Sequence, residues 1–177
     1  MYKRIILILL MTVVVGSATL FAVSLEDIRF KSAISLNTGE ANIGLGVFDG
    51  SFGYSIAVNG DVAGLFDNGF GPYAKLSLDI PGSAFGITLG GAYELPTKRP
   101  DMFLMFTAGP TFRFVSGYFT FGMDVLAHFE WVALSKFYVR ISSGLQMEFV
   151  STMKGFGTVG GFGLYVPLPV IAVGYRF

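Results

Sequence analysis

Apolar and polar side chains alternate with a period of two along most of this chain, and no other feature restricts the fold as strongly. In the stretch from Ser51 to Phe66, large apolar residues such as Phe52 and Ile56 share one parity, and mostly small or polar residues share the other. The parity continues through Asn59-Gly60-Asp61, which favours one long strand over a hairpin at that point. Successive side chains of a β-strand point to opposite faces of the sheet. The pattern therefore predicts strands with one apolar and one polar face.

Charge is scarce in this sequence. Charged residues make up 14% of the 177 residues, against 53% hydrophobic and 16% aromatic, whereas soluble domains carry roughly 25% charged residues. Beyond the N-terminal segment, no run approaches the roughly 18 uncharged apolar residues of a membrane helix. The chain has no cysteine, which excludes disulfides, thiol chemistry and lipoprotein attachment. The apolar content is therefore dispersed over strands.

Turn signals recur every 10 to 16 residues and divide the chain into ten expected strands. Asn37-Thr38-Gly39 and Pro167-Leu168-Pro169 are two of these expected turns. The count is eight if the short segment from Glu40 to Phe48 pairs differently. The ten expected strands are Glu26–Leu36, Glu40–Phe48, Ser51–Phe66, Pro72–Ile80, Ala84–Leu95, Met102–Val115, Tyr118–Ala133, Phe137–Val150, Gly155–Val166 and Val170–Phe177.

The N-terminal segment, residues 1–22, has the pattern of a secretory signal peptide. Lys3 and Arg4 form a short basic start, an apolar segment follows, and cleavage is expected after Ala22 or Ala18. An uncleaved membrane anchor is the alternative interpretation. Removal of residues 1–22 takes away two of the 12 basic and none of the 12 acidic residues, which leaves a formal charge of −2. This balance offers no basic excess for binding nucleic acid.

The final strand, Val170 to Phe177, is the most specific motif. Its apolar parity ends on an aromatic carboxy-terminal residue, with a tyrosine two positions earlier. It resembles the C-terminal assembly signal of bacterial outer-membrane β-barrel proteins, carried here by Tyr175 and Phe177. The resemblance implies a location in the bacterial outer membrane, contact with outer-membrane lipids, and recognition of this strand by the barrel-assembly machinery.

The two faces of the strands differ in a way that indicates which one is inside. Outward aromatics such as Phe119 and Trp131 lie near strand ends, and aliphatics such as Val125 lie at strand centres, as in interfacial girdles around a lipid band. A soluble lipocalin-like barrel would instead bury the apolar face, but a small lumen does not hold so many aromatic rings. We therefore predict an all-β fold, a transmembrane antiparallel up-and-down barrel formed by residues 23–177, with both termini on the periplasmic side.

The charged residues of the expected strands fall almost entirely on the inward parity. Around the turn at Ser135, the register places Glu130 directly across from Arg140, and Asp61 is expected near Lys75. Such facing charges either form ion pairs that hold a plugged lumen together or form a selectivity constriction. The predicted lumen-lining or gating residues are Asp61, Lys75, Arg113, Asp124, His128, Glu130, Arg140 and Glu148. Arg29, Lys31 and Arg176 lie on the first and last strands. They either form a basic cluster at the periplasmic end or have their partners elsewhere in the barrel.

Catalysis has little support in the sequence. His128 is the only histidine, and Asp124 lies four residues away on the same strand, roughly 13 Å distant, too far to orient it. No metal-ligand spacing, nucleophile elbow or phosphate loop is present, so no catalytic residue, metal or cofactor is predicted. The expected function is non-enzymatic: a small-solute pore or a structural membrane protein. The alternative is a lipid-modifying or lipid-binding barrel enzyme with a lateral opening near Pro110, a residue otherwise read as a β-bulge.

Overall fold

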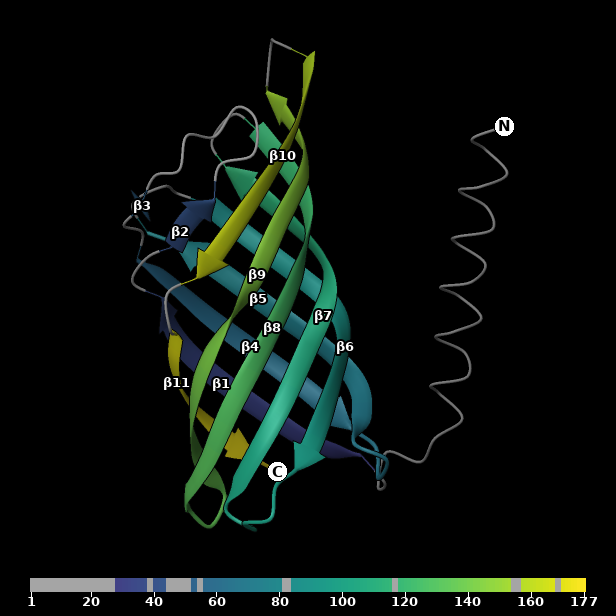
Figure 1. The fold of residues 1–177 in the computed structure, drawn as a ribbon, viewed down its shortest axis with the longest axis vertical. Coiled ribbons are helices and arrows are strands. Elements are labelled where there is room, and N and C mark those ends of the chain that lie inside the picture. Colours follow the sequence, from purple (N-terminus) through teal and green to yellow (C-terminus); the bar gives the residue numbers. More distant parts are fainter. Residues whose placement is uncertain are drawn as a thin grey trace, which may run out of the picture.

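The computed structural model describes residues 28–37, 40–43, 52–53, 56–80, 84–115, 118–153, 157–167 and 170–177. These residues form one antiparallel sheet of tilted strands that closes into a barrel (Figure 1). The expected signal peptide, residues 1–22, lies outside the described residues. The eleven strand segments are β1 (Arg29–Asn37), β2 (Glu40–Ile43), β3 (Phe52–Gly53), β4 (Ala57–Leu65), β5 (Phe70–Asp79), β6 (Ala84–Pro96), β7 (Met102–Val115), β8 (Tyr118–Leu134), β9 (Phe137–Met153), β10 (Gly157–Pro167) and β11 (Val170–Arg176).

The ring of the barrel contains eight strands, so the expected count of ten is wrong and the alternative of eight is confirmed. The lower part of β9 pairs with β11 and its upper part with β10, and both pairings are antiparallel. In the same way β1 pairs with β11 and β2 with β10. Thus β10 and β11 run in one direction as a single strand, and so do β1 and β2. Since β3 and β4 also form one strand, opposite β2 and β1, the eleven segments make eight strands.

The two errors have the same cause. Asn37-Thr38-Gly39 and Pro167-Leu168-Pro169 have the composition of turns, but the strands before and after each of them continue in the same direction. Only the pairing with neighbouring strands distinguishes an interruption of a strand from its reversal. The opposite prediction, that the chain continues straight through Asn59-Gly60-Asp61, is confirmed, because β4 is unbroken there.

The predicted division into two faces is confirmed for the described residues. Large apolar side chains point outward and stay exposed, including Ile34 at 70%, Leu89 at 53% and Ile171 at 61%. Charged residues of the inward parity, such as Lys31 and Glu130, are buried in the lumen. No helix among the described residues is long and apolar enough to cross a membrane. The exposed apolar wall and buried charged interior are the inverse of a soluble barrel.

Pro110 is not the site of a bulge. The register between β6 and β7 is the same on both sides of it, with Thr88 opposite Thr111 and Gly91 opposite Ala108. On its other side Pro110 is paired with Met123 of β8. Between these pairs, Gly90 and Gly109 bring the two backbones so close that a Cβ on Gly90 would lie 2.1 Å from the carbonyl oxygen of Ala108. The glycines let the wall stay in register beside a residue that has no N–H to donate.

Candidate functional site: the charged lumen

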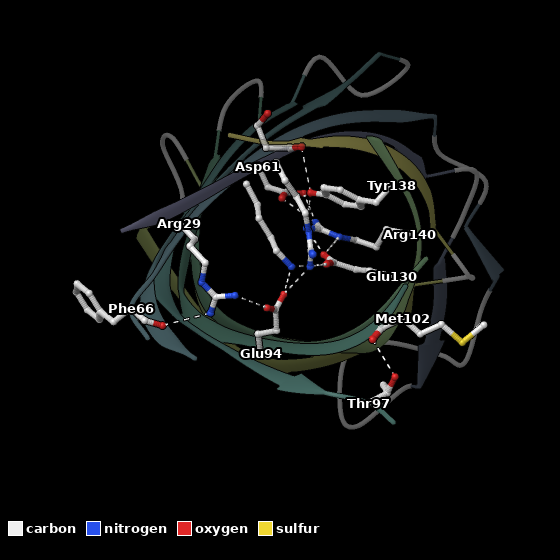
Figure 2. Close-up of polar contacts among 12 residues, drawn as sticks. Arg29, Asp61, Phe66, Glu94, Thr97, Met102, Glu130, Tyr138 and Arg140 are labelled. Carbon is white, nitrogen blue, oxygen red and sulfur yellow. Dashed lines mark hydrogen bonds and ion pairs between the residues drawn. The ribbon is translucent and has the colours of Figure 1, made fainter. Parts of the chain in front are cut away.

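Glu130 on β8 is the centre of the charged lumen (Figure 2). Its Oε2 accepts a hydrogen bond of 2.6 Å from Nζ of Lys31 on β1, and its Oε1 accepts one of 2.9 Å from Nε of Arg140 on β9. The guanidinium of Arg176 on β11 lies 3.7 Å from Oε2. Cations from three strands therefore surround one fully buried carboxylate, which is the condition under which a buried charge is tolerated. The predicted Glu130–Arg140 pair is confirmed.

Arg140 connects this centre to the opposite part of the wall. Its Nη1 donates to both carboxylate oxygens of Asp61 on β4, at 2.7 and 2.9 Å. Its Nη2 donates at 3.0 Å to the hydroxyl of Tyr138, which itself donates to the backbone carbonyl of Ser32 on β1. Since β9 and β4 are separated in the ring by β11 and β1, the Arg140–Asp61 pair crosses the lumen, as Figure 2 shows.

A second carboxylate, Glu94 on β6, lies nearer the end of the barrel that holds Ile28 and Phe177. Lys31 donates a hydrogen bond to it, Nη2 of Arg176 donates at 3.1 Å, and Nη1 of Arg29 lies 3.5 Å away. The guanidinium of Arg176 also stacks 3.8 Å from the centre of the Phe103 ring. The basic residues of the first and last strands thus lie close together, and each has a carboxylate near it. Their carboxylate partners come from β6 and β8, so repulsion at the closing seam is compensated.

A separate ion pair lies further from that end of the barrel. Nζ of Lys75 on β5 donates to Oδ2 of Asp124 on β8 at 2.5 Å, and Thr88 donates to the same oxygen at 2.9 Å. Lys75 is also the register partner of Asp61, so the predicted proximity of these two residues is confirmed. Their ion-pair partners are nevertheless elsewhere, because Asp61 binds Arg140. Strand adjacency alone does not select the partner.

The third group of charges is partly exposed. Arg113 on β7 lies 3.2 Å from Glu148 on β9 and 3.9 Å from Asp79 on β5. Its side chain is 28% exposed, whereas that of Arg140 is 1% exposed. Burial of the charges therefore decreases from Glu130 towards the end of the barrel opposite Ile28 and Phe177.

His128 is held by two hydroxyl groups. Its Nδ1 lies 2.7 Å from Oγ of Ser142 on β9, and its Nε2 lies 2.8 Å from Oγ1 of Thr107 on β7. Both partners come from neighbouring strands, and neither is the carboxylate that a general acid–base pair would require. As expected from the spacing along β8, Asp124 is not a hydrogen-bond partner of the ring within the described part of the chain. The geometry is that of a satisfied, buried histidine.

All eight predicted lumen residues lie inside the barrel, but in separate groups. Asp61, Glu130 and Arg140 form one connected network; Lys75 pairs with Asp124, and Arg113 with Glu148. Lys31, Glu94 and Tyr138 also belong to this network, and none of them was among the predicted lumen residues. Their inward parity was visible, but their central role depends on the closure of β1 against β11. Among the described residues, no cluster of three or more His, Asp or Glu side chains is arranged to hold a metal ion.

An eight-stranded closed barrel with an apolar exterior and a charged interior is the architecture of the small transmembrane barrels of bacterial outer membranes. Neisserial surface protein A has this fold, with a TM-score of 0.58 and 8% identity over 84% of this chain and 97% of that one. The N-terminal barrel domain of OprF from Pseudomonas aeruginosa matches with a TM-score of 0.53 and 10% identity, over 85% of this chain and 98% of the domain.

A designed transmembrane β-barrel matches with a TM-score of 0.50 and 9% identity, over 85% of this chain and 96% of the design. No protein-family model and no curated protein matches the sequence. At these identities the likeness concerns the fold. The chain therefore has the fold of a small outer-membrane β-barrel. Evidence on its function comes from the residues of its own lumen.

Proposed function

We propose that this chain is an integral β-barrel protein of the bacterial outer membrane whose lumen is closed by a buried charge network, and that it acts as a structural membrane protein. The fold likeness, the exposed apolar exterior and the C-terminal strand support the location. The role is non-enzymatic: His128, the only histidine in the chain, is engaged by two hydroxyls. Outer-membrane lipids are the expected surroundings of the outward face.

The burial of Glu130 carries the proposal of a closed lumen. Glu130 is 0% exposed, Arg140 1% and Lys31 2%. In an open aqueous channel these three charged groups would stay in contact with water, because the removal of a charge from water costs free energy. Instead their partners are other protein charges, and these come from opposite sides of the ring. Side chains from opposite walls meet inside the ring at this level (Figure 2), and this contact supports a closed lumen.

Planar-bilayer recordings of refolded protein test this closure. We expect the wild-type protein to insert without producing reproducible conductance steps. The double variant Glu130→Ala/Arg140→Ala removes one charge of each sign together with most of the side-chain volume, and we expect it to conduct. Arg99→Ala is the matched control, because the Arg99–Asp101 pair is exposed at a turn; this variant should be as silent as the wild type.

Two further measurements make the result decisive. Heat-modifiable gel migration establishes that each variant has folded into a barrel before it is recorded. Reproducible wild-type steps whose size changes with Arg140→Ala would contradict the closed lumen and establish a small-solute pore. Density-gradient separation of membranes from expressing cells tests the location separately: the protein should sediment with the outer membrane, and recovery only in the inner-membrane fraction would contradict it.

A further inference from the structure

One lysine at the end of the barrel that holds Phe177 lies over the outer wall. Lys136 is in the turn between β8 and β9, and its backbone carbonyl accepts a hydrogen bond of 2.8 Å from the N–H of Arg176 on β11. This bond holds the turn against the last strand. Nζ of Lys136 lies 5.8 Å from the centre of the Tyr175 ring, which shares the outward parity of the exposed Ile171. The ammonium is therefore on the lipid-facing side of the wall.

Tyr175 is the middle ring of an aromatic cluster on this outward face. Its ring centre lies 5.0 Å from that of Phe137 on β9 and 5.0 Å from that of Phe177, and both contacts are edge-on. These three rings are called the Tyr175 cluster below. Phe137 and Phe177 are exposed, and so is Leu134 beside the turn. Outward aromatic side chains near strand ends lie at the headgroup level of a bilayer. The Tyr175 cluster therefore places the Lys136 ammonium where hydrocarbon meets headgroups.

Within the described ranges, no carboxylate side chain forms an ion pair with Lys136. Two other cations at this end of the barrel differ from it in this respect. Arg99, in the turn between β6 and β7, lies 3.3 Å from Asp101, and Arg176 is bound by Glu94 inside the barrel. A lysine at a membrane boundary lays its stem along apolar surface and keeps its charge among polar groups. The anions at that level of a bilayer are lipid phosphates.

We infer that Lys136 and the Tyr175 cluster form a binding site for the headgroup of an anionic phospholipid, in the leaflet that contacts this end of the barrel. The ammonium of Lys136 pairs with the lipid phosphate, the Tyr175 hydroxyl is a neighbouring hydrogen-bond donor, and the exposed rings contact the acyl chains. A net negative headgroup, as in phosphatidylglycerol, is favoured over a zwitterionic one. The inference rests on the proposed membrane location and is independent of the closed lumen.

The single tryptophan of the chain makes this lipid contact measurable. Trp131 is exposed on the outward face of β8, opposite Val139 in the hairpin that carries Lys136. Lipids with brominated chains quench tryptophan fluorescence on contact. The refolded barrel is placed in vesicles with a fixed mixture of phosphatidylcholine and phosphatidylglycerol, in which one or the other lipid is brominated. We expect phosphatidylglycerol to be enriched about three- to fivefold beside Trp131, relative to its share of the mixture.

Variants at exposed turns locate the preference. Lys136→Gln removes the charge and should abolish the enrichment, whereas Lys136→Arg keeps the charge and should retain it. Lys98→Gln is the matched control, because it makes the same change of charge at an exposed position in the turn between β6 and β7; it should behave as the wild type. Heat-modifiable gel migration establishes that each variant is folded before its fluorescence is measured.

Equal contact of Trp131 with the two lipids in the wild type would overturn the inference, and so would an enrichment that survives Lys136→Gln. An equal loss in Lys136→Gln and Lys98→Gln would also overturn it, because it would indicate a diffuse attraction of anionic lipid to the basic rim. All three results leave the membrane location intact, since Trp131 is quenched in each of them. Absence of quenching by either brominated lipid would instead contradict the location itself and, with it, the site.

Discussion

The ring of Tyr138 lies directly against Gly174, its register partner across β9 and β11. A Cβ added to Gly174 would lie 2.1 Å from Cζ and 2.4 Å from Oη of Tyr138. From this position the phenol hydroxyl donates to the carbonyl of Ser32, so the side chain extends from β9 over β11 to β1. Tyr138 thus connects the three strands that close the barrel, and the glycine provides the space for it.

Gly174→Ala is expected to destabilise the barrel by about 1–3 kcal/mol, because the added methyl group must displace the Tyr138 ring from a packed position. Denaturant unfolding of the refolded protein in micelles measures the free energy of unfolding. Gly60→Ala is the matched control, since nothing lies within 4 Å of a Cβ at that position; it should change the stability by no more than about 0.5 kcal/mol.

A double-mutant cycle tests whether the ring is the cause of this effect. With Tyr138→Ala already present, Gly174→Ala should cost clearly less than it does in the wild type, because the two groups no longer compete for the same space. Additive losses would show that the alanine acts through the backbone of β11 and not through Tyr138.

Glu130→Ala is expected to destabilise the barrel by about 3–5 kcal/mol, because it leaves the ammonium of Lys31 and the guanidinium of Arg140 buried without their shared carboxylate. The contrasting variant is Asp101→Ala, which breaks the exposed pair with Arg99 and should cost no more than about 1 kcal/mol. Equal losses in the two unfolding experiments would contradict the central role of Glu130.

Leu89→Arg should be far less tolerated than Leu95→Arg, although both residues are on the outward parity of β6. Leu89 lies in the middle of the strand and is 53% exposed, whereas Leu95 lies near its end. An arginine at the bilayer midplane costs about 2–4 kcal/mol and much less near the interface. Unfolding from lipid vesicles measures the difference. Similar costs at both positions would mean that the wall does not face hydrocarbon.

Phe177→Ala is expected to reduce the amount of folded protein in the outer membrane of expressing cells, while the purified chain still refolds in detergent. The reason is that Phe177 is 70% exposed, packs on Tyr175 at a ring distance of 5.0 Å, and contributes little to the lumen. Ile171→Ala, on the same strand and face, is the control. A loss that also appears in refolding from detergent would indicate a role in stability and not in recognition by the assembly machinery.

Much of the architecture was predictable because the alternation of side chains is a local property of an extended backbone. The outward position of Ile34 and Leu89, the inward position of the charges, and the passage of β4 through Asn59-Gly60-Asp61 all follow from parity. The Glu130–Arg140 pair was predictable for a similar reason, because a short turn fixes the register of the two strands it joins.

The number of strands and the partners across the lumen were decided only by the tertiary structure. Asn37-Thr38-Gly39 resembles a turn, and only the continuing pairing of β1 and β2 with the strand β10–β11 shows that the direction is kept. Arg140 reaches Asp61, and Lys75 reaches Asp124, across a distance that depends on the strand number and stagger of the closed barrel. Parity determines which side chains enter the lumen; the radius at which the sheet closes determines which of them meet.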